Sequence, residues 1–213
     1  MRSQAGPLAG DHDRVEIVVE SGTLAIEPVA ACVALPGPER TVLELDVTVG
    51  DGARLVLEDA PLVVAEGADV VRTTTIRLGT GATAVVRDLV VLGRAGEGRG
   101  RLESLLRVEG PDGPILHDAL RIEPGARDEY VALAPGDRAV GTVAWLGEGA
   151  GGRGGAASAD GGGGRGGAGG ARVAGGALAR GGALWRAAGA SAADVEAALG
   201  SARAFQAAFG TES

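Results

Sequence analysis

The feature that most constrains this fold is a glycine-hinged unit that recurs along the first part of the chain. EIVVESGTLAI is centred on Gly22, DVTVGDGARLVL on Gly52 and TIRLGTGATAVV on Gly81, at intervals of 29–30 residues. Each copy is an apolar-alternating segment, a short turn with glycine and a second such segment. ALRIEPGARDEYV, around Gly125, is a looser fourth copy. Alternation with a period of two indicates half-buried β-strands, and glycine supplies the positive φ of a tight turn.

A repeat of this length is typical of stacked architectures. We therefore expect an all-β body of solenoid-like layers, in which each copy buries its apolar face on the next. An ordinary β-sandwich with repeated hairpins is the alternative. The segment LVVLG (89–93) is nearly all apolar, which is typical of a strand covered on both faces. Alternation predicts strands at residues 15–20, 42–49, 54–58, 71–78, 84–92, 101–109 and 115–122.

The composition changes at residue 149, because 13 of the 22 residues from 149 to 170 are glycine. A segment of this composition cannot offset its ordering entropy. We expect a β body at 1–147, a disordered linker at 148–172, and a C-terminal part at 173–213 that packs back on the body. This last part should hold a strand around 183–186 and an amphipathic helix at about 192–208. Ser191 followed by Asp194 resembles a capping box, and Gly200 is a weak point of the helix.

The inventory of reactive side chains is small. The chain has two His, one Cys and no Lys, which excludes Schiff-base and P-loop lysines. It contains no G-x-S-x-G, H-E-x-x-H or C-x-x-C motif, so a hydrolase would have to combine His117 with a serine such as Ser104. A net charge of −8 argues against a nucleic-acid surface. No signal peptide or bilayer-spanning apolar run occurs, so we expect a cytoplasmic protein that does not contact the membrane.

Two short segments carry candidate ligands and contacts. GDHD (10–13) places two carboxylates around an imidazole, and these are oxygen and nitrogen ligands for a divalent ion. A turn before a strand is the alternative for this segment. VVLGRAGEGRGRLES (90–104) interleaves Arg94, Glu97, Arg99 and Arg101 with glycines. It is either a solvated hairpin loop or a glycine-hinged loop that meets a partner.

In their order and spacing, these segments resemble the urease accessory protein D family, also called urease accessory protein H, in its high-GC actinobacterial branch. The likeness covers about residues 6–147 and 173–209. Gly10 and Asp11 match the family's Gly-Gly-Asp element, where Ala9 replaces the first glycine. Family members usually begin several strands earlier. We therefore expect this chain to be short at its N-terminus, through a late start codon or as a fragment.

The rest of the resemblance lies further along the chain. Asp88 precedes a strand that ends in Leu-Gly-Arg (92–94), and Gly-Glu follows at 96–97. The segment GGALWRAAGASAADVEAAL (181–199) is similar to the closing strand and helix of the family. The resemblance implies a helicoid of stacked β-strands with one or two C-terminal helices.

The resemblance also implies a role without catalysis. Members of the family are scaffolds for nickel insertion into apo-urease, and they bridge urease to a helical accessory protein and a nickel-delivering GTPase. No tightly bound cofactor is implied, and Ni²⁺ would pass only transiently, through an internal water-filled tunnel. Oxygen ligands suit such transit because they release the ion more readily than thiolates. The alternative is a structural β-layer interaction module without metal traffic.

The resemblance further suggests which residues take part. An exposed strand-end charge is the alternative for each acidic residue. The residues expected along the nickel passage are Asp11, Asp88 and Glu97, with Glu58, Asp59 and His12 behind them. The residues expected to contact a partner are Arg94, Arg99 and Arg101.

Overall fold

A computed structural model of the chain describes residues 6–124, 133–134, 136–147 and 170–200. These residues form thirteen strands and one helix, so the prediction of a mainly all-β fold is confirmed. No helix within these ranges is long and apolar enough to cross a membrane. The elements are β1 (His12–Val19), β2 (Thr23–Ile26), β3 (Cys32–Ala34), β4 (Thr41–Val49), β5 (Arg54–Glu58), β6 (Leu62–Val64), β7 (Asp69–Leu78), β8 (Thr83–Leu92), β9 (Arg101–Gly110), β10 (Gly113–Ile122), β11 (Ala139–Leu146), β12 (Arg172–Ala177), β13 (Gly182–Gly189) and α1 (Ala192–Leu199).

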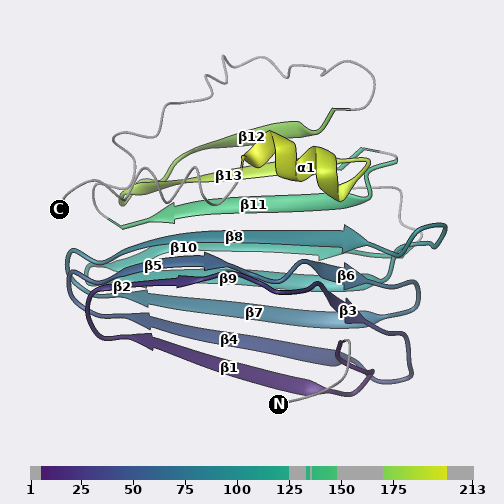
Figure 1. The fold of residues 1–213 in the computed structure, drawn as a ribbon, viewed down its shortest axis with the longest axis horizontal. Helices are drawn as coiled ribbons and strands as arrows, with labels where there is room; N and C mark the ends of the chain where they lie inside the picture. The colour runs from purple at the N-terminus through teal and green to yellow at the C-terminus, as the bar shows by residue number, and fades with distance from the viewer. Residues whose placement is uncertain (1–5, 125–132, 135, 148–169, 201–213) are drawn as a thin grey trace.

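The strands form two sheets that lie face to face (Figure 1). Sheet A has the order β1-β4-β7-β9-β10. Sheet B has the order β12-β13-β11-β8-β5-β2, and the short strands β3 and β6 pair beside the second half of β8. The three pairings within β1-β4-β7-β9 are parallel, as are those of β2 with β5 and β5 with β8. Parallel pairing between successive copies is the mark of a solenoid.

Each glycine turn carries the chain from one sheet to the other. Gly22, Gly52 and Gly81 have φ values of 74°, 64° and 67°, and they connect β1 to β2, β4 to β5 and β7 to β8. The units are therefore arches and not hairpins, and the predicted stacking is confirmed. The apolar faces, however, meet across the two sheets, whereas we expected them to meet between successive copies. Successive copies instead join edge to edge through backbone hydrogen bonds.

The looser fourth copy departs from this pattern. β9 and β10 form an antiparallel hairpin, and β10 ends at Ile122. Gly125, the centre of that copy, lies outside the described residues. β11 and β13 continue sheet B in antiparallel fashion beyond β8. The solenoid thus occupies the first part of the chain, and an antiparallel extension closes the fold.

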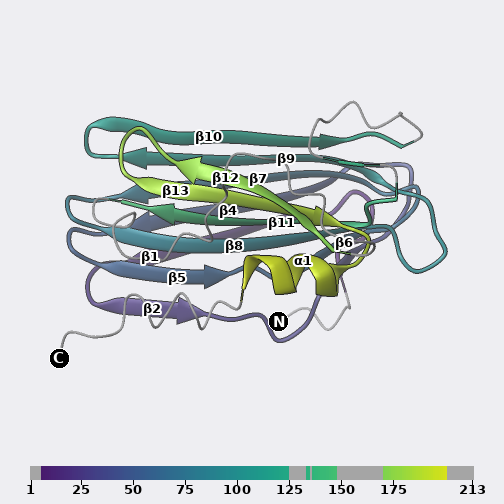
Figure 2. The same cartoon turned by 90° about the horizontal axis from the view of Figure 1, so that it is seen from above.

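β8 is covered on both faces, as its apolar composition predicts. Val86 and Val90 belong to the clusters between the sheets, whereas Val85 and Leu89 pack on the outer face with Val195 of α1. Figure 2 shows α1 against this outer face of sheet B. A strand with apolar residues in both phases therefore belongs to the middle layer of the molecule.

The C-terminal helix begins where its sequence indicates, but α1 ends at Leu199, at the glycine that the sequence marks as a weak point and before the predicted end at about residue 208. The Asp194 amide donates to Ser191 Oγ at 3.1 Å, which is the expected N-cap. Val195 and Leu199 are buried, and α1 contacts β11 and β13. Gly200 follows with φ 77°, so it ends α1 at Leu199. The part of the predicted helix from 201 to 208 and most of the expected linker lie outside the described residues.

The interior between the sheets contains two apolar clusters. One includes Leu55 and Ile76, and the other includes Leu62 and Leu102. Along β7 the second cluster contributes Val70 and the first contributes Ile76, and polar residues lie between them. The same division recurs on β8, β10, β11 and β13. A polar layer therefore separates the two halves of the core.

Candidate functional site

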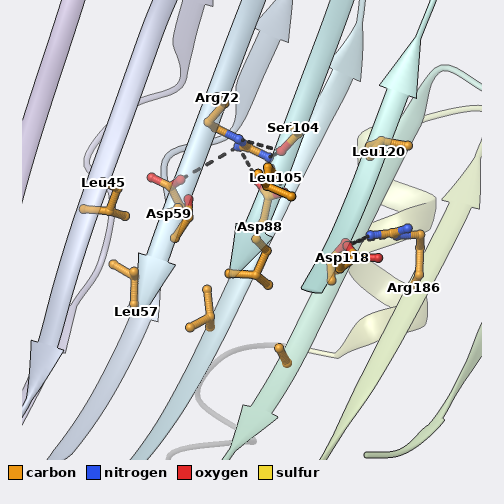
Figure 3. A pocket seen from close by; sticks show the side chains of 15 residues that line it. Leu45, Leu57, Asp59, Arg72, Asp88, Ser104, Leu105, Asp118, Leu120 and Arg186 are labelled. Atoms are coloured by element: carbon orange, nitrogen blue, oxygen red, sulfur yellow. Dashed lines mark hydrogen bonds and ion pairs between the residues drawn. The ribbon is translucent and has the colours of Figure 1, made fainter. Parts of the chain in front are cut away.

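The polar layer is the feature of the interior that stands out chemically. It consists of Asp59, Arg72, Asp88, Ser104, Asp118, Thr142 and Arg186, which line a cavity of about 40 Å³ together with Thr74 and apolar side chains of both sheets (Figure 3). A volume of this size admits roughly one to three water molecules. The layer thus combines charged groups with a small space between the sheets.

Strand alternation carries these side chains inward. On β8, Asp88 occupies the same face as Val86 and Val90, two core residues that flank it. In the strand register, Arg72 of β7 lies opposite Ser104 of β9. On sheet B, Asp88 pairs with Thr142, which in turn pairs with Arg186. Register therefore aligns Asp88, Thr142 and Arg186 in one row on sheet B. On sheet A it aligns Arg72 with Ser104, whereas Asp118 pairs with Leu106, two positions along β10 from the partner of Ser104.

Arg72 binds the carboxylates of sheet B from sheet A. Its Nη1 and Nη2 donate to Oδ1 and Oδ2 of Asp88 at 2.7 and 2.5 Å. Its Nε and Nη2 contact Ser104 Oγ at 3.2 and 3.0 Å, and Nη1 lies 3.8 Å from Asp59 Oδ2. The residue is only 7% exposed. Charge-assisted, two-pronged contacts of this kind are among the stronger hydrogen bonds in proteins.

A second arginine connects the sheets on the other side of the layer. Arg186 of β13 forms an ion pair with Asp118 of β10, and its Nε donates to Thr142 Oγ1 at 3.3 Å. Figure 3 shows the two arginine–aspartate pairs in the same layer. The antiparallel extension is thereby linked to the edge strand of sheet A through the interior.

The layer has an excess of negative charge. It contains three aspartates and two arginines. Burial raises the pKa of Asp59, and the nearby Asp88 carboxylate raises it further, while Arg72 and the amide of Ala60 act to lower it. The pKa of the Cys32 thiol, which senses the charge of Asp59, is also raised, chiefly by burial. Protonation at Asp59 is therefore easier than at an exposed aspartate.

Two of the six residues expected along the nickel passage, Asp59 and Asp88, lie in the polar layer. Asp11 lies in the turn before β1, where its Oδ2 accepts from the Leu8 amide at 3.0 Å. His12 Nε2 lies 2.9 Å from Glu44 Oε2 on adjacent strands of sheet A, and both side chains are substantially exposed. Neither of these two sites lies in the layer.

Glu58 and Glu97 also lie elsewhere. Glu58 forms an ion pair with Arg87 on the neighbouring strand, and neither lines the cavity. Glu97 belongs to the loop between β8 and β9, where it binds Arg94. Within the part of the chain that the structure describes, no three His, Cys, Asp or Glu side chains are grouped so as to hold a metal ion. The four outlying residues therefore do not extend the layer.

The arginines expected to contact a partner already have partners within the chain. Arg99 Nη2 donates to the Asp137 carbonyl at 2.9 Å, and Arg101 Nη2 lies 3.2 Å from Glu123 Oε2. The Arg94 side chain is 53% exposed even though it binds Glu97. A role for these three arginines in partner binding stays a prediction.

Glu97 should titrate far below an ordinary glutamate. The hydrogen bond from Arg94 Nε, at 2.7 Å, holds its pKa at about 2. Because the folded-state pKa is depressed, the ionised form stabilises the fold above about pH 4.5, and this contribution is lost as the pH falls toward 2. We expect Arg94→Gln to return the pKa toward 4.5, measured by NMR titration of the Glu97 carboxyl carbon. Arg77→Gln is the control, and an unshifted Glu97 in the unchanged protein would contradict the prediction.

Several residues of the layer escaped prediction from sequence. They are Arg72, Ser104, Asp118, Thr142 and Arg186. The signal that could have found the charged ones is a charge in the apolar phase of an alternating strand, such as Arg72 after Val70 in DVVRTTTIRL. The hydrolase pair is not assembled, because Ser104 lines the cavity, whereas His117 lies in the opposite phase of β10 from the lining residue Asp118.

Comparisons with known proteins identify the family of this chain. The family model of the UreD urease accessory protein matches residues 1–213. The chain is 38% identical over 148 residues to urease accessory protein UreD 3 of Streptomyces griseus, and 40% identical over 172 residues to UreD of Frankia alni. It is 39% identical over 147 residues to UreD of Streptomyces coelicolor.

These three alignments cover 66–68% of this chain and 57–58% of the relatives. The chain thus spans less than two thirds of the length of the relatives that it matches. The family expected from the glycine turns and the Leu-Gly-Arg strand end is confirmed: the chain belongs to the UreD urease accessory protein family.

Proposed function

We propose that this protein is a non-enzymatic scaffold in urease maturation, which passes nickel toward apo-urease through its polar layer. It would bridge urease to a helical accessory protein and a nickel-delivering GTPase. The observation that carries the proposal is a group of three partly buried carboxylates around a small cavity, inside a member of an accessory family. In this proposal nickel is the cargo and no cofactor is bound tightly.

The chemistry of the layer supports transit. Asp59 and Asp88 offer oxygen ligands, which bind divalent ions of this kind less tightly than thiolates do. The cavity lets an ion keep part of its water shell between the carboxylates. Asp118 offers a third carboxylate on the other side of the layer. These three aspartates are the residues that we assign to the passage.

Stability alone does not require such a layer. Replacing a buried ion pair with apolar residues of similar volume is often neutral or stabilising. The fold retains two arginine–aspartate pairs between two well-packed apolar clusters. A function for the charges is therefore a better explanation than their contribution to folding.

A structural interaction module without metal traffic is the second candidate. The outer surface of sheet A favours it, because the described helix packs on sheet B instead. That surface carries a network in which Arg101 lies between Asp69 and Glu123, and Arg121 between Glu103 and Glu123. An ordered, charged sheet face of this kind would suit a protein partner whether or not nickel passes inside.

The two candidates differ in what happens when the layer loses its charge. The variant Arg72→Met/Asp88→Leu removes one ion pair and fills its place with apolar side chains of similar volume. In a urease-producing strain, we expect it still to be pulled down with its accessory partners, while the nickel content of purified urease falls at least fivefold. Asp46→Asn, an ion-paired aspartate on the outer surface, is the matched control. If urease keeps its full nickel content with the double variant, nickel passage through the layer is rejected and the structural interaction module is the remaining candidate.

A further inference from the structure

The guanidinium of Arg72 lies between two partly buried carboxylates. Its Nη1 lies 2.7 Å from Asp88 Oδ1 and 3.8 Å from Asp59 Oδ2. Arg72 belongs to β7 of sheet A, Asp88 to β8 of sheet B, and Asp59 to the connection between β5 and β6 of sheet B. Ser104 Oγ accepts from the same group. Oxygen atoms of three side chains, Asp59, Asp88 and Ser104, therefore surround one buried positive charge.

We propose that Arg72 is a gating residue, whose guanidinium blocks a divalent-cation position between Asp59 and Asp88 that metal enters only by displacing it. The cargo named here rests on the proposed function, but the binding property does not. With Arg72 in place the two carboxylates and the guanidinium carry a single net negative charge. Without it the charge is that of two carboxylates, which matches a divalent ion.

The gate would act through electrostatic repulsion between the Arg72 guanidinium and an entering metal ion. Charges of like sign a few ångströms apart interact strongly where water is largely excluded, and Arg72 is only 7% exposed. A metal ion beside an undisplaced guanidinium would therefore bind weakly. The cavity of about 40 Å³ that Arg72 lines gives its long side chain room to turn away.

The same arrangement explains how metal would leave. A displaced guanidinium remains tethered to β7, so it competes for the carboxylates at a high local concentration. Return of Arg72 to Asp88 restores the hydrogen bonds at 2.7 and 2.5 Å and expels the ion. Further along the layer, Arg186 forms an ion pair with Asp118 and would compete with a metal ion for that carboxylate in the same way. Competition from Arg72 thus shortens the time that the metal ion stays bound, even where the carboxylates are good ligands.

The test is a nickel titration of the purified full chain by equilibrium dialysis at neutral pH. We expect Arg72→Gln to bind NiCl₂ at least tenfold more tightly than the unchanged protein. Adding Asp88→Asn to this variant should abolish the gain. Arg87→Gln is the matched control, because Arg87 is also a buried arginine paired with one carboxylate, Glu58, but does not line the cavity. Circular dichroism checks that each variant is folded.

If Arg72→Gln fails to fold, Ser104→Ala carries the test. It removes two contacts to the guanidinium and leaves its charge, so we expect about threefold tighter nickel binding. A folded variant that binds no tighter, or an equal gain with Arg87→Gln, rejects the gate. Because the titration uses this chain alone, such a result is independent of the nickel content of urease, which tests the proposed function.

Discussion

Asp88→Ala should lower the free energy of unfolding by about 3 kcal/mol, because it leaves the Arg72 guanidinium in the interior without its main partner. The value lies at the low end for broken buried pairs, since the Asp88 side chain is 23% exposed and Asp59 lies 3.8 Å from Arg72. Urea denaturation followed by circular dichroism measures the change. Asp46→Ala is the control and should cost less than about 1 kcal/mol, because that pair lies on the outer surface.

The double variant Arg72→Met/Asp88→Leu separates charge from packing. Removing both charges leaves no buried guanidinium without a carboxylate. Asp59 and Ser104 lose only their weaker contacts with Arg72, so most of the stability lost in Asp88→Ala should return. Equal destabilisation of the single and double variants would show that the ion pair itself contributes to folding. A recovered fold is also what makes this variant suitable for testing nickel delivery.

Truncation of either apolar cluster is the second large effect. Leu55 and Leu102 are 1% and 0% exposed, and they belong to different clusters. We expect each change to alanine to cost about 2–5 kcal/mol, because it removes buried methyl groups and leaves a cavity. The comparison is Leu8→Ala, a 45% exposed position that should change stability by less than about 0.5 kcal/mol.

The combination of the two core changes tests the division of the interior. Because the polar layer lies between the clusters, Leu55 and Leu102 share no packing partners, and their costs should add within about 0.5 kcal/mol. Urea denaturation of both single variants and the double variant gives the coupling energy. A coupling well above this value would mean that the two clusters form one cooperative core across the layer.

The repeat in the sequence predicts the stacking because it reflects a geometric requirement. Parallel coils stay in register only if each has nearly the same length, so Gly22, Gly52 and Gly81 recur at nearly constant spacing. The short strands β3 and β6 were missed, because three residues show no periodicity. β12 was missed as well, because its sequence RVAGGA is rich in glycine and alanine, which are depleted in strands.

Only part of the polar layer could be predicted from the sequence. A charge among inward apolar residues can be recognised on one strand, as with Asp88 between Val86 and Val90. The partner of such a charge cannot be recognised from the sequence. Arg72 and Asp88 belong to different sheets, so their contact depends on how the two sheets face each other. Resemblance to a family proposed Asp59 and Asp88 but also proposed His12 and Glu97, whose surroundings are exposed and separate from the layer.

The register between coils has a consequence for how such a chain changes length. β1 pairs with β4 from His12 with Val42, and β4 with β7 from Thr41 with Val70, so neighbouring coils are nearly equal in length. The next coil, which pairs Asp69 with Arg101, is longer, and its additional residues are accommodated in the loop between β8 and β9. Insertions are thus tolerated at corners, where no ladder is interrupted. Within the strands, only the gain or loss of a complete coil preserves the hydrogen bonds between neighbouring coils. Proteins of this fold should therefore differ in their number of complete coils and in the lengths of the loops at the corners.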